Sequence, residues 1–88
     1  MPMLKIYGSM LCPDCVQCLA DLDKAGVAYE YLDFSDNLKN LKEFLNIRDC
    51  DPIFADAKRQ GSIGIPCIID EQGSVQLDWR VYVGQAEA

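Results

Sequence analysis

Three of the five cysteines lie within nine residues, in the segment from Met10 to Cys18 (MLCPDCVQC). They form two overlapping Cys-x-x-Cys boxes, CPDC and CVQC, which share Cys15. Two thiols at this spacing can exchange with a disulfide, and cysteine thiolates can also bind zinc or an iron–sulfur cluster. The sequence is therefore compatible with two chemistries in this segment, thiol–disulfide exchange and metal binding.

The overall composition narrows the chemistry open to these thiols. The chain has 88 residues, half of them apolar, and a formal net charge of -6. Binding to phosphates requires clustered Lys and Arg, so we expect no nucleic-acid partner. The sequence contains no histidine, which excludes Cys-His and Ser-His-Asp catalysis and any zinc site with imidazole ligands.

Targeting signals are the next feature to consider. No apolar run reaches the length of a membrane span, and the segment MPMLKIYGSM has no basic region followed by an apolar one. We therefore expect a cytoplasmic protein without a membrane partner, whose cysteines are reduced and serve reactivity rather than permanent disulfides. The length fits one small domain, residues 1–88, which we expect to be a monomer.

A strand and a helix must position the two boxes. Residues 3–7 form an apolar run typical of a strand. Pro13 fits the first position of a helix, which we expect to run to Ala25 and to stop at Gly26. Its predicted buried face carries Cys15, Val16, Leu19, Ala20 and Leu22, with Cys18 at the edge. Its predicted solvated face carries Asp14, Gln17, Asp21 and Lys24.

Strands and helices alternate along the rest of the chain. The expected elements are strands over residues 27–34, 63–70 and 75–77, and helices that begin at Leu38 and at Pro52, the latter ending at Gly61. Residues 71–74 would form a hairpin turn. The tail, residues 78–88, fits either a short helix or an extended arm, and its Trp79 and Tyr82 would close the core. This order predicts an α/β fold, β-α-β-α-(α)-β-β, with a four-stranded mixed sheet flanked by helices.

The two boxes differ in where they place their thiols. Cys12 would cap the helix, where backbone N–H groups and the helix dipole favour an anion such as a thiolate. Cys15, one turn later, could attack a mixed disulfide on Cys12 and release the bound partner. The carboxylate of Asp14 would oppose the thiolate, which favours a more reducing site. Neither thiol of CVQC lies at a helix end, so we predict Cys12 as the nucleophile and Cys15 as the resolving thiol.

Other uses of the cysteines stay open. Cys12, Cys15 and Cys18, with or without Cys67, could hold zinc or an iron–sulfur cluster, although three cysteines on consecutive turns fit a tetrahedron poorly. Cys18 and Cys67 could also be additional redox thiols or small buried core residues, and for Cys67 we favour the core. Cys50 lies in an expected polar loop and is assigned no role. A module that binds a partner without turnover is disfavoured by the intact CPDC box.

The segment from Lys5 to Cys15 (KIYGSMLCPDC) resembles the active-site segment of glutaredoxins, which belong to the thioredoxin superfamily. In both, a strand ending in Tyr is followed by four residues and then by Cys-Pro-x-Cys. Gly64-Ile65-Pro66 resembles the Thr-Val-Pro of that family, and the order of elements resembles it over nearly the whole chain. The resemblance selects CPDC as the active box and implies a thioredoxin-like, glutaredoxin-type fold with a shortened C-terminal helix.

The resemblance also implies a function and a set of substrate-binding residues. The chain would be a thiol–disulfide oxidoreductase that reduces a disulfide-containing protein or small molecule. The peptide bond before Pro66 would be cis, and the backbone of Ile65 would pair with an extended substrate, so Pro13, Ile65 and Pro66 are the expected substrate-binding residues. No bound cofactor or metal is expected, and the electron donor would be glutathione or a thioredoxin-reductase-type system.

The sequence departs from the family where glutathione would bind. No Gly-Gly-x-Asp segment follows the last hairpin, and Ser9 replaces the Lys that glutaredoxins carry two residues after the Tyr. The net charge of -6 also disfavours an anionic tripeptide. The sequence therefore predicts dithiol chemistry with weak use of glutathione.

Overall fold

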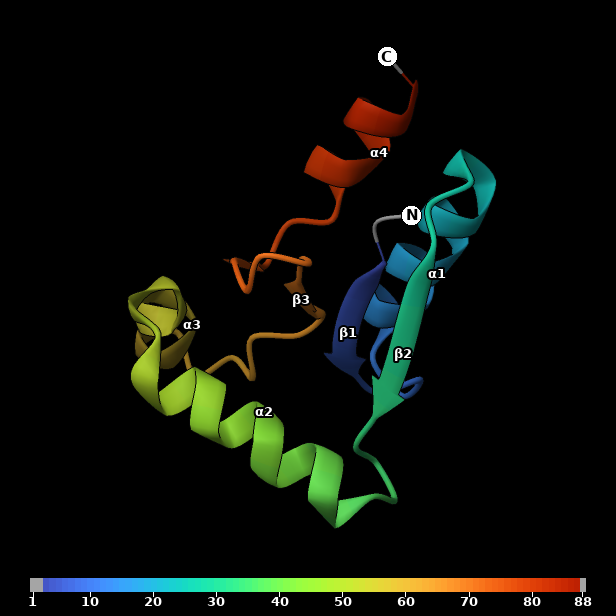
Figure 1. The fold of residues 1–88 in the computed structure, drawn as a ribbon. Coiled ribbons are helices and arrows are strands. Elements are labelled where there is room, and N and C mark those ends of the chain that lie inside the picture. The colour runs from blue at the N-terminus through green and yellow to red at the C-terminus, as the bar shows by residue number, and fades with distance from the viewer. Residues whose placement is uncertain (1–2, 88) are drawn as a thin grey trace.

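Strands and helices alternate along residues 3–87, which are the residues that this computed structural model describes (Figure 1). The elements are β1 (Leu4–Gly8), α1 (Pro13–Ala25), β2 (Tyr29–Asp33), α2 (Leu38–Cys50), the 3-10 helix η1 (Pro52–Phe54), α3 (Ala55–Arg59), β3 (Cys67–Ile69), β4 (Val75–Gln76) and α4 (Arg80–Glu87). This order confirms the α/β class predicted from the sequence.

The four strands form one mixed sheet in the order β2-β1-β3-β4. β1 pairs with β2 in parallel, whereas the β1–β3 and β3–β4 pairs are antiparallel. In the parallel pair Ile6 is opposite Tyr31 and Gly8 is opposite Asp33. The carboxyl ends of β1 and β2 therefore meet at one edge of the sheet, immediately before the cysteine box.

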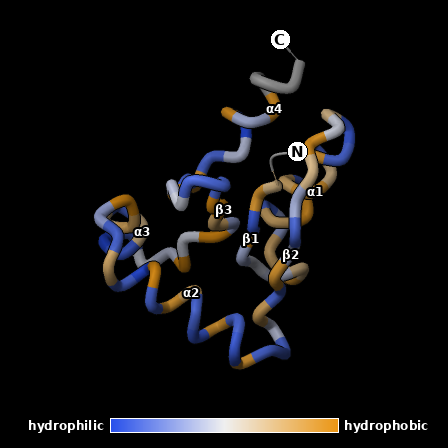
Figure 2. Tube along the Cα trace, viewed as in Figure 1, coloured by the Kyte–Doolittle hydropathy of each residue, from blue (hydrophilic) through white to orange (hydrophobic). Residues whose placement is uncertain are grey.

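Helices cover both faces of the sheet (Figure 1). On one face Leu4 and Ile6 of β1 pack in a buried cluster with Leu22 of α1 and with Trp79, just before α4. On the other face Tyr7 of β1 packs with the buried aromatic rings of α2 and η1 and with the thiol of β3. Hydrophobic and hydrophilic residues alternate along α2, as expected for a helix with one face on the sheet (Figure 2).

The helix after the box begins and ends where the sequence predicts. Cys12 is the N-cap with extended backbone (φ -95°, ψ 120°), Pro13 occupies the first turn, and Gly26 ends the helix in the left-handed conformation (φ 74°). Its buried residues are Cys15, Cys18 and Leu22. The predicted burial of Val16 is wrong, because this side chain is 43% exposed, and Ala20 is exposed as well.

The buried face of α1 is narrower than predicted. Its buried residues are spaced three and four residues apart, so they form a single row of side chains along the side of the helix that packs on the sheet. The prediction placed Cys18 at the edge of this face. In the structure Cys18 is fully buried beside Leu4, Ile6 and Leu22.

α2 extends further than the expected helix. Asn37 caps it by accepting a hydrogen bond from the Asn40 N–H (3.0 Å), and the helix continues to Cys50. The prediction of a polar loop around Cys50 is therefore wrong, since the helix ends only where Asp51 leads into Pro52. The expected helix from Pro52 onward is divided into η1 and α3, because Phe54 has φ -85° and ψ 0° between them.

The strands in the second half of the chain are shorter than predicted. β3 contains Cys67–Ile69 instead of residues 63–70, and the Ile65–Pro66 peptide bond before it is cis, as the resemblance implied. The tail forms the short helix α4 and not an extended arm. Trp79 is 5% exposed and Tyr82 packs against its cluster, so both close the core as predicted.

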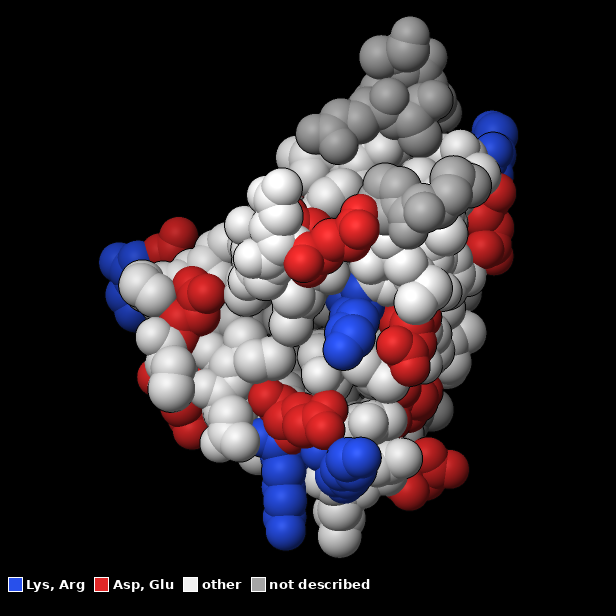
Figure 3. Space-filling view, in the orientation of Figure 1, with Lys and Arg blue, Asp and Glu red and all other residues white. Residues whose placement is uncertain are grey.

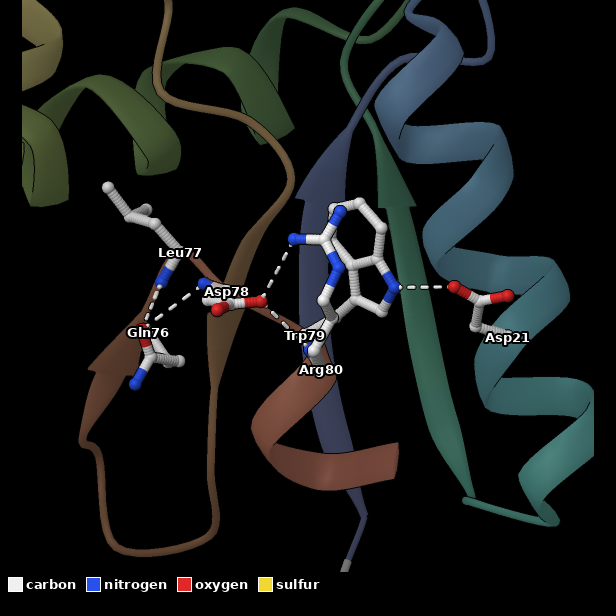
Figure 4. A network of polar contacts seen from close by, with 6 residues as sticks. All are labelled: Asp21, Gln76, Leu77, Asp78, Trp79 and Arg80. Atoms are coloured by element: carbon white, nitrogen blue, oxygen red, sulfur yellow. Dashed lines mark hydrogen bonds and ion pairs between the residues drawn. The ribbon is translucent and has the colours of Figure 1, made fainter. Parts of the chain in front are cut away.

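A polar network at the start of α4 attaches the tail to α1 (Figure 4). The indole N–H of Trp79 donates to Asp21 Oδ2 at 2.8 Å, and the Arg80 guanidinium lies 4.7 Å from the centroid of the Trp79 ring. The predicted role of Asp21 as part of a merely solvated face is therefore wrong. Its bond with Trp79, followed by one from Gln17, lowers the pKa of the Asp21 carboxyl.

Charged side chains of both signs are interspersed on the face shown in Figure 3, and they do not form a continuous basic stripe there. Acidic residues outnumber basic ones by 14 to 8 in the whole sequence. Within residues 3–87, no helix combines the length and the apolar character needed to cross a membrane.

Candidate functional site

Cys12 lies at the junction between the sheet edge and α1. Its backbone N–H donates to the Ser9 carbonyl (3.0 Å), and its own carbonyl accepts from the N–H groups of Cys15 (3.1 Å) and Val16 (3.2 Å). These bonds fix Cys12 as the first residue of the helical turn, with its side chain partly exposed. A thiolate at this position would meet the positive end of the helix dipole.

Cys15 is fully buried one turn further along α1. Its backbone N–H donates to the Cys12 carbonyl, and both cysteines are free thiols. Burial raises the pKa of the Cys15 thiol to about 12, a backbone hydrogen bond from Ser9 opposes this rise, and Cys12 and Asp14 add to it. The pair therefore combines a partly exposed thiol at a helix end with a buried thiol that is protonated at neutral pH.

The loop before the box is held by the end of β2. The Met10 N–H donates to Asp33 Oδ2 at 3.3 Å, and the Leu11 N–H donates to Ser9 Oγ at 3.1 Å. The hydroxyls of Ser9 and Ser35 are hydrogen-bonded with each other, and the Ser35 N–H donates to Asp33 Oδ1 at 2.7 Å. This last bond is the main reason that the pKa of Asp33 lies below its usual value. The backbone on the N-terminal side of Cys12 is thus fixed from two strands.

A cavity of about 510 Å³ opens beside Cys12. Its lining consists of uncharged residues, namely Ser9, Leu11, Cys12, Phe34, Ser35, Leu41, Ile63 and Ile65. Leu11 is 88% exposed and Ile63 is 55% exposed, so apolar surface continues outward from the cavity. A group attached to Cys12 would therefore meet mainly aliphatic and aromatic side chains.

The three expected substrate-binding residues occupy different environments. Ile65 lines the cavity together with Cys12. Pro66 is fully buried next to it, and Pro13 is exposed in the first turn of α1. Of the three, only Ile65 is brought into the wall of the cavity.

The two other buried cysteines, Cys18 and Cys67, lie on opposite faces of the sheet. Cys18 is buried on the α1 face, whereas Cys67 is buried on the opposite face with Tyr7, Phe44 and Phe54. Burial raises the pKa of each thiol to about 12. Within the part of the chain that the structure describes, no group of three or more Cys, Asp or Glu residues could hold a metal ion.

Sequence reasoning missed several residues that surround the box. Phe34 follows β2, Leu41 lies on α2 and Ile63 precedes the cis proline, and all three line the cavity. Tyr31 of β2 was also missed, although its hydroxyl reaches the end of β1. The parallel pairing of β1 and β2 carried the signal, because parallel strands end at the same edge and residues 31–35 had to lie beside the box.

The comparisons with known proteins identify one relative. A protein of Haemophilus influenzae, described only as uncharacterized, is 39% identical over 73 residues. The alignment covers 83% of this chain and 85% of the relative. No family model matches the chain, and neither does any solved structure.

Proposed function

We propose that this chain is a thiol–disulfide oxidoreductase with a thioredoxin-like fold of the glutaredoxin type. The chain belongs to the same family as the Haemophilus influenzae protein. One observation carries the proposal. A partly exposed thiol at the N-terminus of α1, Cys12, lies one helical turn from a buried thiol, Cys15, beside an apolar cavity. The mixed sheet order β2-β1-β3-β4 and the cis bond before Pro66 support the fold assignment.

The reaction would proceed in two exchange steps. The Cys12 thiolate attacks one sulfur of the substrate disulfide, so a Cys12 mixed disulfide forms and the first substrate thiolate leaves and takes up a proton. Cys15 then loses its proton and attacks the Cys12 sulfur. The Cys12–Cys15 disulfide forms, the mixed disulfide breaks and the second substrate thiol leaves. The substrate has gained two electrons, and an external thiol reductant returns the pair to the reduced state.

The cavity beside Cys12 suggests the class of substrate. Its lining carries no Lys or Arg, and five of its eight residues are apolar. A substrate whose cysteine has an apolar neighbour would bury that neighbour without leaving a charge unpaired. The proposed substrates are therefore protein or peptide disulfides with apolar flanks, and no bound cofactor is required for either step.

Serine variants of the box test the proposal directly. With dithiothreitol as reductant and a peptide disulfide with apolar flanks as substrate, Cys12→Ser should abolish acceleration over the uncatalysed reaction. Incubated with the substrate in the absence of dithiothreitol, Cys15→Ser should accumulate a mixed disulfide on Cys12, detectable as a mass increase. Cys50→Ser, which removes an exposed thiol at the end of α2, is the matched control and should keep full activity.

Two results would overturn the proposal. One is full activity in Cys12→Ser. The other is a stoichiometric amount of zinc or iron in the freshly purified protein, lost in the Cys12→Ser and Cys15→Ser variants, which would support the metal or cluster carrier instead.

A further inference from the structure

The hydroxyl of Tyr31 and the thiol of Cys15 approach the same point beside β1. A Cβ atom at position 8 would lie 2.7 Å from Cys15 Sγ and 3.5 Å from Tyr31 Oη. Tyr31 reaches this point from β2, where it is opposite Ile6 in the parallel pair. The two side chains therefore flank one narrow space that only Gly8 leaves open.

We propose that Tyr31 is a positioning residue for the resolving step, donating a hydrogen bond to the Cys15 sulfur as this thiol loses its proton. The inference rests on the proposed function and extends it from the two cysteines to β2. Tyr31 is partly buried, so water competes less for its hydroxyl than it would at the surface.

Asp33 fixes the direction of the Tyr31 hydroxyl without holding it tightly. The hydroxyl donates to Asp33 Oδ2 at 3.4 Å, and the same oxygen accepts from the Met10 N–H at 3.3 Å. Both are long bonds, whereas the carboxylate is anchored by the Ser35 N–H at 2.7 Å. A phenol whose bond to a fixed acceptor is long can turn toward a second charged acceptor, and a thiolate forming nearby is such an acceptor.

The tyrosine acts as a donor and not as a base. Burial first, then the charges of Asp33 and Cys15, raise the pKa of Tyr31 well above its usual value, so its proton stays in place at neutral pH. The proton of Cys15 therefore leaves to water or to the departing substrate thiolate. In the balanced step the Cys12–Cys15 bond forms and the Cys12 mixed disulfide breaks; an alkyl leaving group takes up the proton and becomes a thiol, whereas an aryl leaving group stays a thiolate and the proton goes to water.

The other groups that face the Cys15 thiol act mainly against its ionisation. Cys12 and Asp14, both on or next to the first turn of α1, raise the pKa of Cys15, while a backbone hydrogen bond from Ser9 lowers it. A neutral donor from β2 supplies stabilisation that none of the α1 side chains provides. This is the role that we assign to Tyr31.

The test separates the two exchange steps. A symmetric aryl disulfide that releases a coloured thiolate reports the attack by Cys12 as a first release and the attack by Cys15 as a second. Stopped-flow measurements use the full chain with Cys50→Ser, which removes the exposed thiol. Tyr31→Phe is compared with Tyr29→Phe, a matched control on the same strand whose hydroxyl donates to Asp23 at 2.8 Å.

We expect Tyr31→Phe to slow the second release about 10- to 100-fold, the effect of losing one hydrogen bond to a charged sulfur. The first release should change less than about twofold, and the pH dependence of the second step should move to higher pH. Tyr29→Phe should leave both steps as they are. A second release as fast as in the parent, or equal slowing of both steps, would overturn this inference alone. Release of only one thiolate from the parent protein would overturn the proposed function and this inference together.

Discussion

Gly8 and Cys15 are so close that no side chain fits between them. A Cβ atom at position 8 would stand 2.7 Å from Cys15 Sγ, a distance that Cβ atoms essentially never show. Gly8 is not among the glycines with positive φ, so its backbone conformation is open to other residues. Space, and not backbone conformation, is therefore the reason for glycine at the end of β1.

The first prediction follows from this contact. Gly8→Ala should destabilise the protein by about 1–3 kcal/mol, because the fully buried Cys15 has no room to retreat. In a Cys15→Ala background the sulfur is gone and the remaining contact, 3.5 Å to the Cβ of residue 15, is ordinary. Urea unfolding of the four variants gives the coupling energy. An equal cost of Gly8→Ala in both backgrounds would contradict the assigned clash.

The second prediction concerns the order in which the five cysteines react. Cys12 is partly exposed at a helix N-terminus, Cys50 is exposed, and the remaining three are fully buried. A brief iodoacetamide pulse below neutral pH should therefore label Cys12 first, because the N-terminus of α1 presents unpaired backbone N–H groups to its accessible sulfur. Cys50 should react like an ordinary exposed thiol, and the buried three only after unfolding. Peptide mapping gives the order in which the cysteines are alkylated. Faster labelling of Cys50 than of Cys12 would contradict the assignment of Cys12 as the nucleophile.

The third prediction is a loss of stability at alkaline pH. Burial raises the pKa of Cys15, Cys18 and Cys67 to about 12, above the value of about 8.5 for an exposed thiol in the unfolded chain. Their stabilising effect is complete below that unfolded pKa. As pH rises above about 9, the unfolded state loses protons first, and each thiol lowers the free energy of unfolding by about 1.4 kcal/mol per pH unit.

Single substitutions test the alkaline effect. Cys18→Ala should reduce the dependence of the free energy of unfolding on pH by the contribution of one thiol. Urea unfolding over about two pH units, from about pH 8 to about pH 10, measures this dependence. Cys50→Ser, which removes the exposed cysteine, is the matched control variant. If the free energy of unfolding of Cys18→Ala depends on pH as strongly as that of the parent, burial does not keep the Cys18 thiol protonated.

The helix that carries the thiols was predictable because its signals are local. Pro13 and Gly26 mark its ends through their own backbone preferences, and both ends were confirmed. Which flank of the helix is buried depends on the sheet, so Val16 was placed inside and Cys18 at the edge, the reverse of what the structure has. Hydrophobic periodicity indicates how the residues of one helix face are spaced, but it does not indicate which side of the helix packs against the sheet.

The wall of the site was harder to predict than the thiols. Leu11, Phe34, Leu41 and Ile63 come from four different segments, and no short motif joins them. Asp21 was read as solvated because nothing near it in the sequence indicates a partner 58 residues away. Such contacts depend on where the tail packs against α1 in the folded chain. Hydrophobic patterning and secondary-structure propensity do not specify that position.

The fourth prediction concerns the bond between Trp79 and Asp21. Trp79 fills the α1 face of the core and donates its only polar group to a carboxylate (Figure 4). Trp79→Ala should cost about 3–5 kcal/mol in the free energy of unfolding, because it leaves a cavity between α1 and the tail. Arg80→Ala removes only the exposed cation over the ring and should cost less than about 1 kcal/mol. Equal losses in the two variants would show that the ring is not part of the core.

The last prediction is weak use of glutathione as a substrate or reductant. A glutaredoxin that uses it must pair the two terminal carboxylates of the tripeptide, whereas the cavity beside Cys12 has no charged lining residue. The cations that could replace the missing contacts, Lys5, Lys39, Lys42 and Arg59, are all absent from that lining. Arg48 donates to the carbonyls of Ser62 and Ile63 at 2.8 Å and is absent from it too.

Each missing charge-assisted contact is worth roughly 1.5–3 kcal/mol, so losing both weakens binding by about two to four orders of magnitude. We expect slow reduction of a glutathionylated peptide and faster reduction of a peptide disulfide with apolar flanks when both are assayed with the same dithiol reductant. Leu41→Lys, which places a cation on the cavity wall, should improve the first reaction relative to the second. Leu45→Lys, on the same helix but outside the cavity, is its control. Saturation of the parent protein at millimolar or lower glutathione with rapid turnover would contradict the prediction, because it requires carboxylate contacts that this cavity does not offer.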